Sequence, residues 1–256
     1  MNKIIGIISY LPNETEARKL RYERVVRLFN QIQEFWPDIP ILLIKQNWKM
    51  TKIPVVKNTL IKKNYPEPLG ILGARQELER QFLALEEQFD YLILFDDDAI
   101  IEETEPSGAK KYIEEIDKHP DGFCFLQYAS AQLSGCAISR FIIKKEPMVS
   151  VSAENNEAYE DTLYSNLLHY KYSEREFING GINCTQFQKK DEIAPSTWSE
   201  NKTGKDYQVL TKNTYQIVDY IKRHKELPKN IKQIIQNNKP KAKKKHTYLD
   251  LDYLGL

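Results

Sequence analysis

The sequence predicts an α/β protein whose core is a mostly parallel β-sheet with helices on both faces. Apolar segments of strand length alternate along the chain with segments whose apolar residues recur at helical spacing, which is typical of parallel sheets. One strand-like segment, residues 91–95, ends abruptly in three consecutive aspartates. With 256 residues, 41% of them hydrophobic, the chain is long enough to bury a substantial core.

The elements of the first part of the chain follow from their apolar patterns. Residues 3–9 are almost all apolar, so we expect a strand that is buried on both faces. Residues 16–35 predict an amphipathic helix, whose expected inward side chains are Leu20, Val25, Leu28, Phe29 and Ile32. Shorter apolar runs predict a second strand at residues 39–44 and a third at residues 53–56.

The alternation continues after residue 70. Residues 73–89 predict a helix, because apolar side chains recur there at helical spacing: Leu78, Phe82, Leu85 and Phe89. We expect a fourth strand at residues 91–95, a helix at residues 107–118 and a strand at residues 123–127. Paired glycines predict a hairpin or a tight loop within residues 176–185.

Two polar loops follow strands of this predicted sheet. The first strand runs into Ser9, Tyr10, Pro12 and Asn13, and the fourth runs into residues 96–98. Ligands of open α/β sheets bind outside the carboxyl ends of the strands. The sequence therefore predicts that both loops lie on one rim and that this rim binds the ligand.

The three aspartates are the strongest chemical signal in the chain. Adjacent carboxylates repel one another and resist burial, so their place at the end of a buried strand indicates a neutralising cation. In an extended chain Asp96 and Asp98 point to the same side and Asp97 faces away. The alternative is a solvated acidic turn at a strand end.

No glycine-rich phosphate loop is present to neutralise a bound phosphate. The sequence contains neither a Gly-x-Gly-x-x-Gly after the first strand nor a Gly-Lys-Ser/Thr loop, which argues against dinucleotide enzymes and P-loop phosphotransferases. Arg75, in the first turn of its predicted helix, is the candidate side chain for a nucleotide or diphosphate. Its alternative partner is Glu79, four residues further along the same helix.

Four short motifs occur along the chain in one order. They are Ala74-Arg75, Asp96-Asp97-Asp98, Gly135 followed by a short strand and Arg140, and Glu160-Asp161. Together they resemble the nucleotide-sugar glycosyltransferases of the GT-A fold, most closely the inverting family 2 and its relatives. The resemblance covers roughly residues 1–190 and implies a GT-A-type sheet flanked by helices, with a small C-terminal helical extension.

The resemblance also implies roles for individual residues. Asp96 and Asp98 are expected to hold Mn²⁺ or Mg²⁺, which stabilises the leaving diphosphate. The expected donor-binding residues are Ser9, Tyr10, Pro12, Asn13, Arg75, Asp96, Asp97 and Gly135. Asp161 corresponds to the general base of the family, and Glu160 is the nearer alternative.

Other interpretations of the acidic pair remain open. Acidic residues in the first turn of a helix interact well with its dipole, and apolar residues that follow the pair look like such a helix. The base could also come from residues 155–157 or from Asp191.

We expect three segments along the chain: a catalytic domain at residues 1–205, two short helices packed on it at residues 206–238, and a basic linker and tail at residues 239–256. Net charge is only +1, so the run Lys241–Lys245 is the one place expected to contact a polyanion or a membrane surface, unless it is a solvated linker.

Cysteine usage and hydropathy indicate the compartment. Three cysteines form neither an even disulfide set nor a metal-binding spacing, and no apolar run is long enough to cross a bilayer. We expect a cytoplasmic protein, soluble or attached peripherally at the inner face of the membrane.

The expected activity is transfer of a hexose, with inversion, from a nucleotide diphosphate sugar, with a UDP-sugar as the first choice. The acceptor is expected to be a hydroxyl of a glycan or of a lipid-linked molecule. Two alternatives remain. One is the same chemistry on a nucleic acid, such as a modified DNA base, or on a protein. The other is a nucleotide-binding or nucleotidyl-transferring relative.

Overall fold

The computed structural model describes residues 1–49, 51–85, 88–126, 133–148, 164–165, 168, 171–177 and 179–186. Its centre is a six-stranded sheet made of β1 (Lys3–Tyr10), β2 (Ile41–Gln46), β3 (Leu60–Tyr65), β4 (Tyr91–Asp96), β6 (Phe123–Cys124) and β7 (Ala137–Ser139). The strand order is β3-β2-β1-β4-β7-β6. Strands β1 to β4 are parallel, whereas β7 is antiparallel to both of its neighbours, β4 and β6. The predicted mostly parallel α/β sheet is confirmed.

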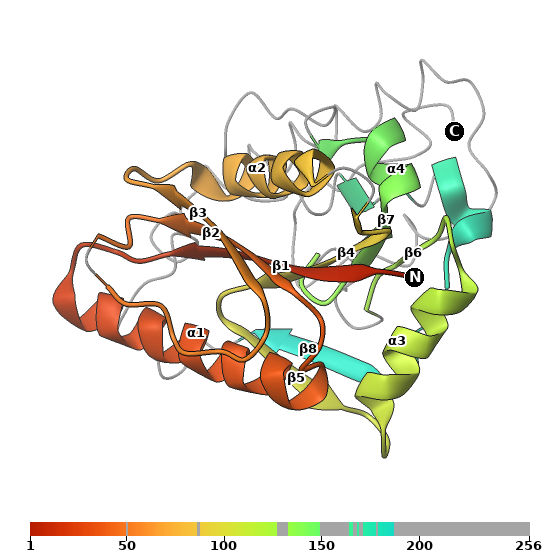
Figure 1. Ribbon diagram of the computed structural model, residues 1–256, viewed down its shortest axis with the longest axis horizontal. Coiled ribbons are helices and arrows are strands. Elements are labelled where there is room, and N and C mark those ends of the chain that lie inside the picture. Colours follow the sequence, from red (N-terminus) through yellow and green to blue (C-terminus); the bar gives the residue numbers. More distant parts are fainter. Residues whose placement is uncertain are drawn as a thin grey trace, which may run out of the picture.

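Helices cover both faces of this sheet (Figure 1). α1 (Thr15–Phe35) lies on one face, and α2 (Gly70–Ala84) and α4 (Arg140–Lys145) lie on the other. α3 (Gly108–Lys118) packs on the same side as α1, next to a second sheet. That sheet pairs β5 (Ala99–Glu103) antiparallel with β8 (Ile182–Gln186). A short 3-10 helix, η3 (Ser173–Arg175), precedes β8.

Alternation along the central strands divides the core into two layers. Ile5 and Ile7 of β1 belong to the layer under α1, which also contains Val25, Leu28, Phe29 and Ile32 of that helix. Ile4 and Ile8 belong to the layer under α2, together with Leu78 and Phe82. Every residue from Lys3 to Ser9 is therefore buried. This explains why the first strand is an unbroken apolar run.

The prediction of a strand at residues 53–56 is wrong. These residues have no regular secondary structure, and the third strand is β3 at Leu60–Tyr65. Ile53 and Val56 are apolar because they pack against the core layer under α1. β3 is the outermost strand of its sheet and exposes residues 62–64, so its sequence lacks a continuous apolar signal.

The other predicted elements differ from the observed ones mainly at their ends. α2 begins at Gly70 rather than at residue 73, and it ends at Ala84. β6 covers only Phe123–Cys124 of the predicted strand at residues 123–127. The predicted hairpin or tight loop at residues 176–185 contains the turn before β8 and most of that strand. The predicted C-terminal helices at residues 206–238 and the tail at residues 239–256 lie outside the described residues.

Two further expectations concern cysteines and membranes. Cys124, Cys136 and Cys184 are all buried and form no disulfide. None of the helices in the described ranges combines the length and the apolar character that a bilayer-spanning segment needs.

Candidate functional site

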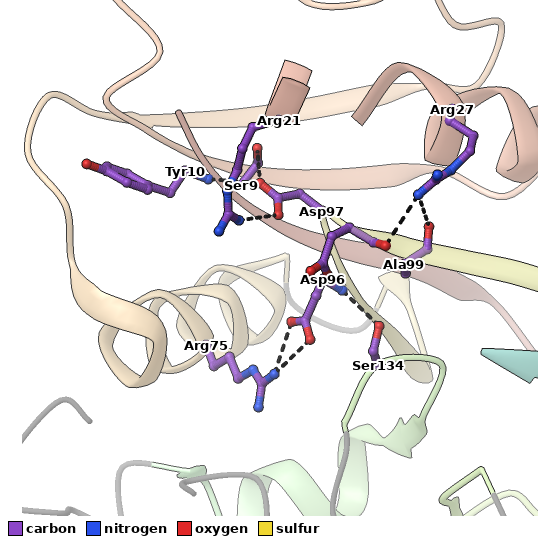
Figure 2. A network of polar contacts seen from close by, with 10 residues as sticks. Ser9, Tyr10, Arg21, Arg27, Arg75, Asp96, Asp97, Ala99 and Ser134 are labelled. Carbon is purple, nitrogen blue, oxygen red and sulfur yellow. Dashed lines mark hydrogen bonds and ion pairs between the residues drawn. The ribbon is translucent and has the colours of Figure 1, made fainter. Parts of the chain in front are cut away.

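The acidic turn lies where β4 reaches the carboxyl edge of the central sheet. The strand ends at Asp96, and Asp97 and Asp98 form a turn that leads directly into β5. The side-chain alternation of a strand therefore does not continue through all three residues. Asp96 and Asp97 lie in different environments: Asp96 faces Arg75, and Asp97 faces Ser9 and Arg21 (Figure 2).

Asp96 is paired with an arginine of the neighbouring helix. Nη2 of Arg75 lies 3.0 Å from Oδ1 and 3.1 Å from Oδ2 of Asp96. The Arg75 side chain, from the second turn of α2, is 4% exposed. Its pair is thus with the acidic turn and not with Glu79, which accepts a hydrogen bond from the amide of Met148 instead. The structure therefore brings together two of the predicted donor-binding residues.

Asp97 is buried and joins the acidic turn to the end of β1. The hydroxyl of Ser9 donates to Oδ2 at 2.8 Å, and the amide of Tyr10 donates to the same oxygen at 3.2 Å. Nη1 of Arg21 lies 3.2 Å from Oδ1. Burial raises the pKa of Asp97, and Arg21, Ser9 and Tyr10 oppose that rise. This carboxylate holds the acidic turn against the end of β1.

Asp98 is the aspartate of the three whose charged form is most disfavoured by burial and by its neighbours. Its side chain is half-buried, and within the described part of the chain its carboxylate makes neither a hydrogen bond nor an ion pair. Burial, followed by repulsion from Asp97 and Asp96, raises the pKa of Asp98 to about 7. A divalent cation would relieve this repulsion.

A row of arginines on α1 faces the rim, and it is the main feature of the site that was not predicted from the sequence. Arg18, Arg21, Arg24 and Arg27 recur at intervals of three, which places them along one side of the helix. The signal was present in this spacing, directly after the first strand.

These arginines act on different parts of the rim. Arg18 donates to the carbonyls of Leu11, Pro12 and Trp48 and to the hydroxyl of Thr51. Arg27 reaches the carbonyls of Asp98 and Ala99 at 3.4 and 3.5 Å. Arg24 is buried and acts on Asp98 electrostatically. One turn further on, Gln31 bonds both main-chain groups of Ile101, so α1 aligns the chain from the acidic turn into β5.

The loop after β1 is held by a second set of polar contacts. Oδ1 of Asn13 accepts from Nζ of Lys49 at 2.6 Å and from Nδ2 of Asn47 at 3.2 Å. Asn47 also donates to the carbonyl of Leu11, which precedes Pro12. The ring of Tyr10 points away from the aspartates (Figure 2). The four residues predicted from this loop therefore lie at the rim, with Ser9 and Tyr10 in direct contact with Asp97.

Gly135 supports the acidic turn from the side of β7. Its φ is 82°, and a Cβ atom there would collide with Leu126 and Cys184, so glycine satisfies both the conformation and the space. Its neighbour Ser134, which was not predicted as a site residue, accepts from the amide of Asp96 at 3.0 Å. Gly135 is buried, which gives it a packing role beside the predicted donor site.

Arg140, the arginine of the third motif, belongs to the scaffold. Its guanidinium donates to the carbonyls of Phe82 and Leu83 in the last turn of α2 and to the carbonyl of Phe89, which lies between α2 and β4. It also lies over the ring of Phe82, with Cζ 4.3 Å from the ring centroid. These contacts fix α2, and with it Arg75, relative to β7 and α4.

The carboxylates of the turn suit a hard cation only in part. Within the described residues, no group of three or more His, Cys, Asp or Glu side chains is arranged to hold a metal ion. Asp96 and Asp98 offer oxygen ligands, and a diphosphate would supply further oxygens. The pair therefore fits a cation that is shared with a ligand, with Arg75 remaining beside Asp96. Glu160, Asp161, Glu157, Asp191 and Lys241–Lys245 lie outside the described residues.

Comparison with known proteins finds limited similarity. No family model and no curated protein matches the sequence. The crystal structure of A197 from STIV has 10% identity and a TM-score of 0.40 over 73% of this chain and 86% of its own. A glycosyltransferase involved in the glycosylation of the major capsid of PBCV-1 has 13% identity and a TM-score of 0.39 over 68% of this chain and 80% of its own. Likeness at this level carries no functional argument, so function must be argued from the residues of the site.

Proposed function

We propose that this protein is a glycosyltransferase that moves a hexose from a nucleotide diphosphate sugar to a hydroxyl of a glycan or a lipid-linked acceptor. The observation that carries the proposal is the contact of Asp97 with Ser9 and Tyr10. This contact joins the end of β1, where its loop begins, to the acidic turn after β4, so the two loops form one rim. A nucleotide diphosphate spans such a rim, with its nucleoside at the first loop and its phosphates at the second.

The residues of the turn have distinct proposed roles. Asp96 and Asp98 would hold Mn²⁺ or Mg²⁺, which acts as a Lewis acid on the departing diphosphate when it is bound. Arg75 stays beside Asp96 and offers positive charge where the leaving group gains negative charge. Asp97 keeps the two loops in register from its buried position.

The acceptor hydroxyl must lose its proton as it attacks the anomeric carbon. We assign that proton to the carboxylate of Asp161, with Glu160 as the alternative, by analogy with the family that the sequence resembles. A base on the face opposite the leaving group gives inversion at the anomeric carbon. The donor is proposed to be a UDP-sugar.

The first experiment is a donor screen. Hydrolysis of UDP-, GDP- and dTDP-sugars is measured with Mn²⁺, with Mg²⁺ and with EDTA. The control is a Ser9→Ala, Asp97→Asn double variant, which breaks the contact that joins the two loops and should lose hydrolysis of every donor that the wild type accepts. The proposal is wrong if the wild-type protein hydrolyses none of these donors and also binds no nucleotide.

The basic run Lys241–Lys245 favours one alternative acceptor, a nucleic acid. The chemistry at the rim would be the same. In a gel-shift assay, duplex DNA should then be retained at low salt and released as salt increases. DNA that is not retained at any salt concentration leaves a glycan or lipid-linked acceptor as the proposal.

A further inference from the structure

We propose that the outer edge of the central sheet, at β3 and the connection that precedes it, binds a membrane surface rich in anionic lipids. The binding surface is formed by Lys52, Val55 and Lys57 of the connection between β2 and β3 and by Lys62 of β3. We call these four residues the edge surface. The inference does not depend on nucleotide-sugar chemistry, because none of the four belongs to the acidic turn or to the loop after β1.

The edge surface comes from a stretch of the chain that carries one sign of charge. Residues 39–66 contain six lysines and neither aspartate nor glutamate, in a chain whose net charge is only +1. A stretch of this kind cannot neutralise itself, so it presents a positive potential unless other elements supply carboxylates.

The described part of the chain supplies no carboxylate to these lysines. The side chains of Lys52, Lys57 and Lys62 are exposed, and their ammonium groups make neither an ion pair nor a hydrogen bond with any described residue. Burial lowers the pKa of the nearby Lys45, and repulsion from the charge of Lys62 lowers it further. Positive charge at this edge is therefore in excess, and an anionic partner would relieve the repulsion.

The connection and β3 carry the edge surface on the side of the sheet that α1 covers. Ile53 and Val56 of the connection pack against the core layer under α1, and the amide of Lys57 donates to a glutamine of that helix. Leu60 of β3 packs against the same layer, so the alternation of the strand places Lys62 on this side as well. Figure 1 shows the connection beside α1.

An exposed apolar side chain distinguishes the edge surface from a patch that is only basic. Val55 is 96% exposed and lies in the sequence between Lys52 and Lys57. Such a side chain gains free energy when it enters the acyl boundary of a membrane, while lysines beside it reach the lipid phosphates. A nucleic acid offers phosphates without an apolar phase, so the combination favours a lipid surface.

Protection of an edge strand does not explain the whole set. Lysines on such strands prevent pairing with another chain, and this role accounts for Lys62. It does not account for Lys52 and Lys57, which precede the strand. Val55 works against it, because an exposed apolar residue favours association.

Binding at the edge surface would bring the rim close to the membrane. Arg18 of α1 donates to Trp48 and Thr51 at the start of the connection, and Lys49 donates to Asn13 of the loop after β1. The connection is thus joined to one of the two loops of the rim. A lipid-linked acceptor, as in the proposed function, is presented at such a surface.

The test measures binding of the full chain to vesicles by co-sedimentation. Vesicles of phosphatidylcholine alone are compared with vesicles that also contain about 30% phosphatidylglycerol, an anionic lipid. Wild-type protein should bind the anionic vesicles more tightly, and less so at high salt. A triple variant, Lys52→Gln, Lys57→Gln and Lys62→Gln, should bind them roughly 100-fold more weakly, because each lysine near an anionic surface contributes about five-fold.

α3 supplies a control that is matched in charge. Lys110, Lys111 and Lys118 are exposed and each pairs with a glutamate. Their replacement by glutamine removes the same three charges and should leave vesicle binding close to that of the wild type.

Val55 provides a second readout that charge alone would not change. Val55→Ser should weaken binding to anionic vesicles by roughly five-fold, since an apolar side chain no longer enters the boundary. Fluorescence of the Val55→Trp variant should shift to shorter wavelengths when anionic vesicles are added.

Three results would overturn the inference. The first is equal vesicle binding by the two triple variants. The second is binding that depends on Lys241–Lys245 instead. The third is absence of vesicle binding together with retention of duplex DNA through Lys52, Lys57 and Lys62, which would assign the edge surface to a nucleic acid. Each of these results leaves the donor screen, and with it the proposed function, unaffected.

Discussion

Gly108 and Gly181 pack backbone against backbone where α3 begins and the turn before β8 ends. A Cβ atom on either residue would collide with the carbonyl oxygen of the other. The amide of Thr104 donates to the carbonyl of Gly181 at 3.1 Å, and its hydroxyl donates to the carbonyl of Gly180 at 2.8 Å. This contact fixes the start of β8, which pairs with β5 directly after the acidic turn.

Gly181→Ala should destabilise the protein by about 1–3 kcal/mol, because the added methyl group forces two backbones apart. Urea denaturation gives the free energy of unfolding. Gly180→Ala is the control, since no atom lies within 4 Å of a Cβ built at Gly180. Equal stability of the two variants would show that the backbones can separate at no cost.

Stability should depend on pH through Glu79. This carboxyl is 3% exposed, and burial raises its pKa to about 8, opposed by the amide of Met148 and the hydroxyl of Tyr164. The folded state holds a proton that the unfolded state releases near pH 4.5. The stabilisation is thus complete below pH 4.5 and is lost as pH rises toward 8, with a slope of up to about 1.4 kcal/mol per pH unit.

Glu79→Gln tests this linkage, because glutamine resembles the protonated acid. Its unfolding free energy should fall less than that of the wild type between pH 5 and pH 8. Glu114→Gln, at a side chain that is 55% exposed, serves as the control and should follow the wild type. Parallel curves for all three proteins would mean that Glu79 titrates as an ordinary carboxylate.

Asp98→Asn should raise the melting temperature of the metal-free protein, because it removes repulsion from Asp97 and Asp96. A gain of about 1 kcal/mol corresponds to about 2–4 °C for a domain of this size. The same variant should lose the stabilisation that UDP with Mn²⁺ provides to the wild type. Asp38→Asn, at an exposed position, should keep it. Retention in Asp98→Asn would remove Asp98 from the cation site.

Asp161→Asn should keep donor affinity and lower turnover by roughly 10²–10⁴-fold, as expected for loss of a positioned base. Glu160→Gln is the comparison, and a larger loss there would transfer the role to Glu160. NMR of the product should show an anomeric configuration that is inverted relative to the donor. Retained configuration, or wild-type turnover in both variants, would exclude this pair from proton transfer.

Removal of residues 239–256 should leave donor hydrolysis nearly unchanged, because all four motifs precede residue 190. Transfer to a polymeric or membrane-bound acceptor should fall if Lys241–Lys245 contacts a polyanion. A control that keeps the tail and replaces its lysines by glutamine separates charge from length. Loss of donor hydrolysis on truncation would place the tail in the catalytic domain.

The elements that the sequence predicts best are strands that are buried on both faces and helices that are buried along one side. β1 and β4 were found within one residue, because a strand under helices on both faces must be apolar throughout. α1 was predicted because the apolar residues on its core-facing side recur at helical spacing. These elements place the loops after β1 and β4 on one rim, which is why the position of the candidate site could be predicted.

Edge elements were harder to predict for the opposite reason. β3 pairs with one strand only and exposes its central residues. Its sequence therefore lacks the run of apolar residues that marks a buried strand. The apolar residues Ile53 and Val56 led to the prediction of a strand, although they belong to an irregular segment that packs against the core layer under α1. Two apolar residues in a short segment indicate that the segment is buried, but they do not indicate whether its backbone forms a strand.

Partner choice within the site was decided by the tertiary structure alone. The sequence determined that three aspartates end a buried strand and that Arg75 lies near the start of a helix. It left open whether Arg75 pairs with Glu79 or with a distant residue, because local spacing permits both. Only packing of α2 on the central sheet brings Arg75 to Asp96, and only packing of α1 brings Arg21 to Asp97, since ion pairs between elements depend on distances that no single segment encodes.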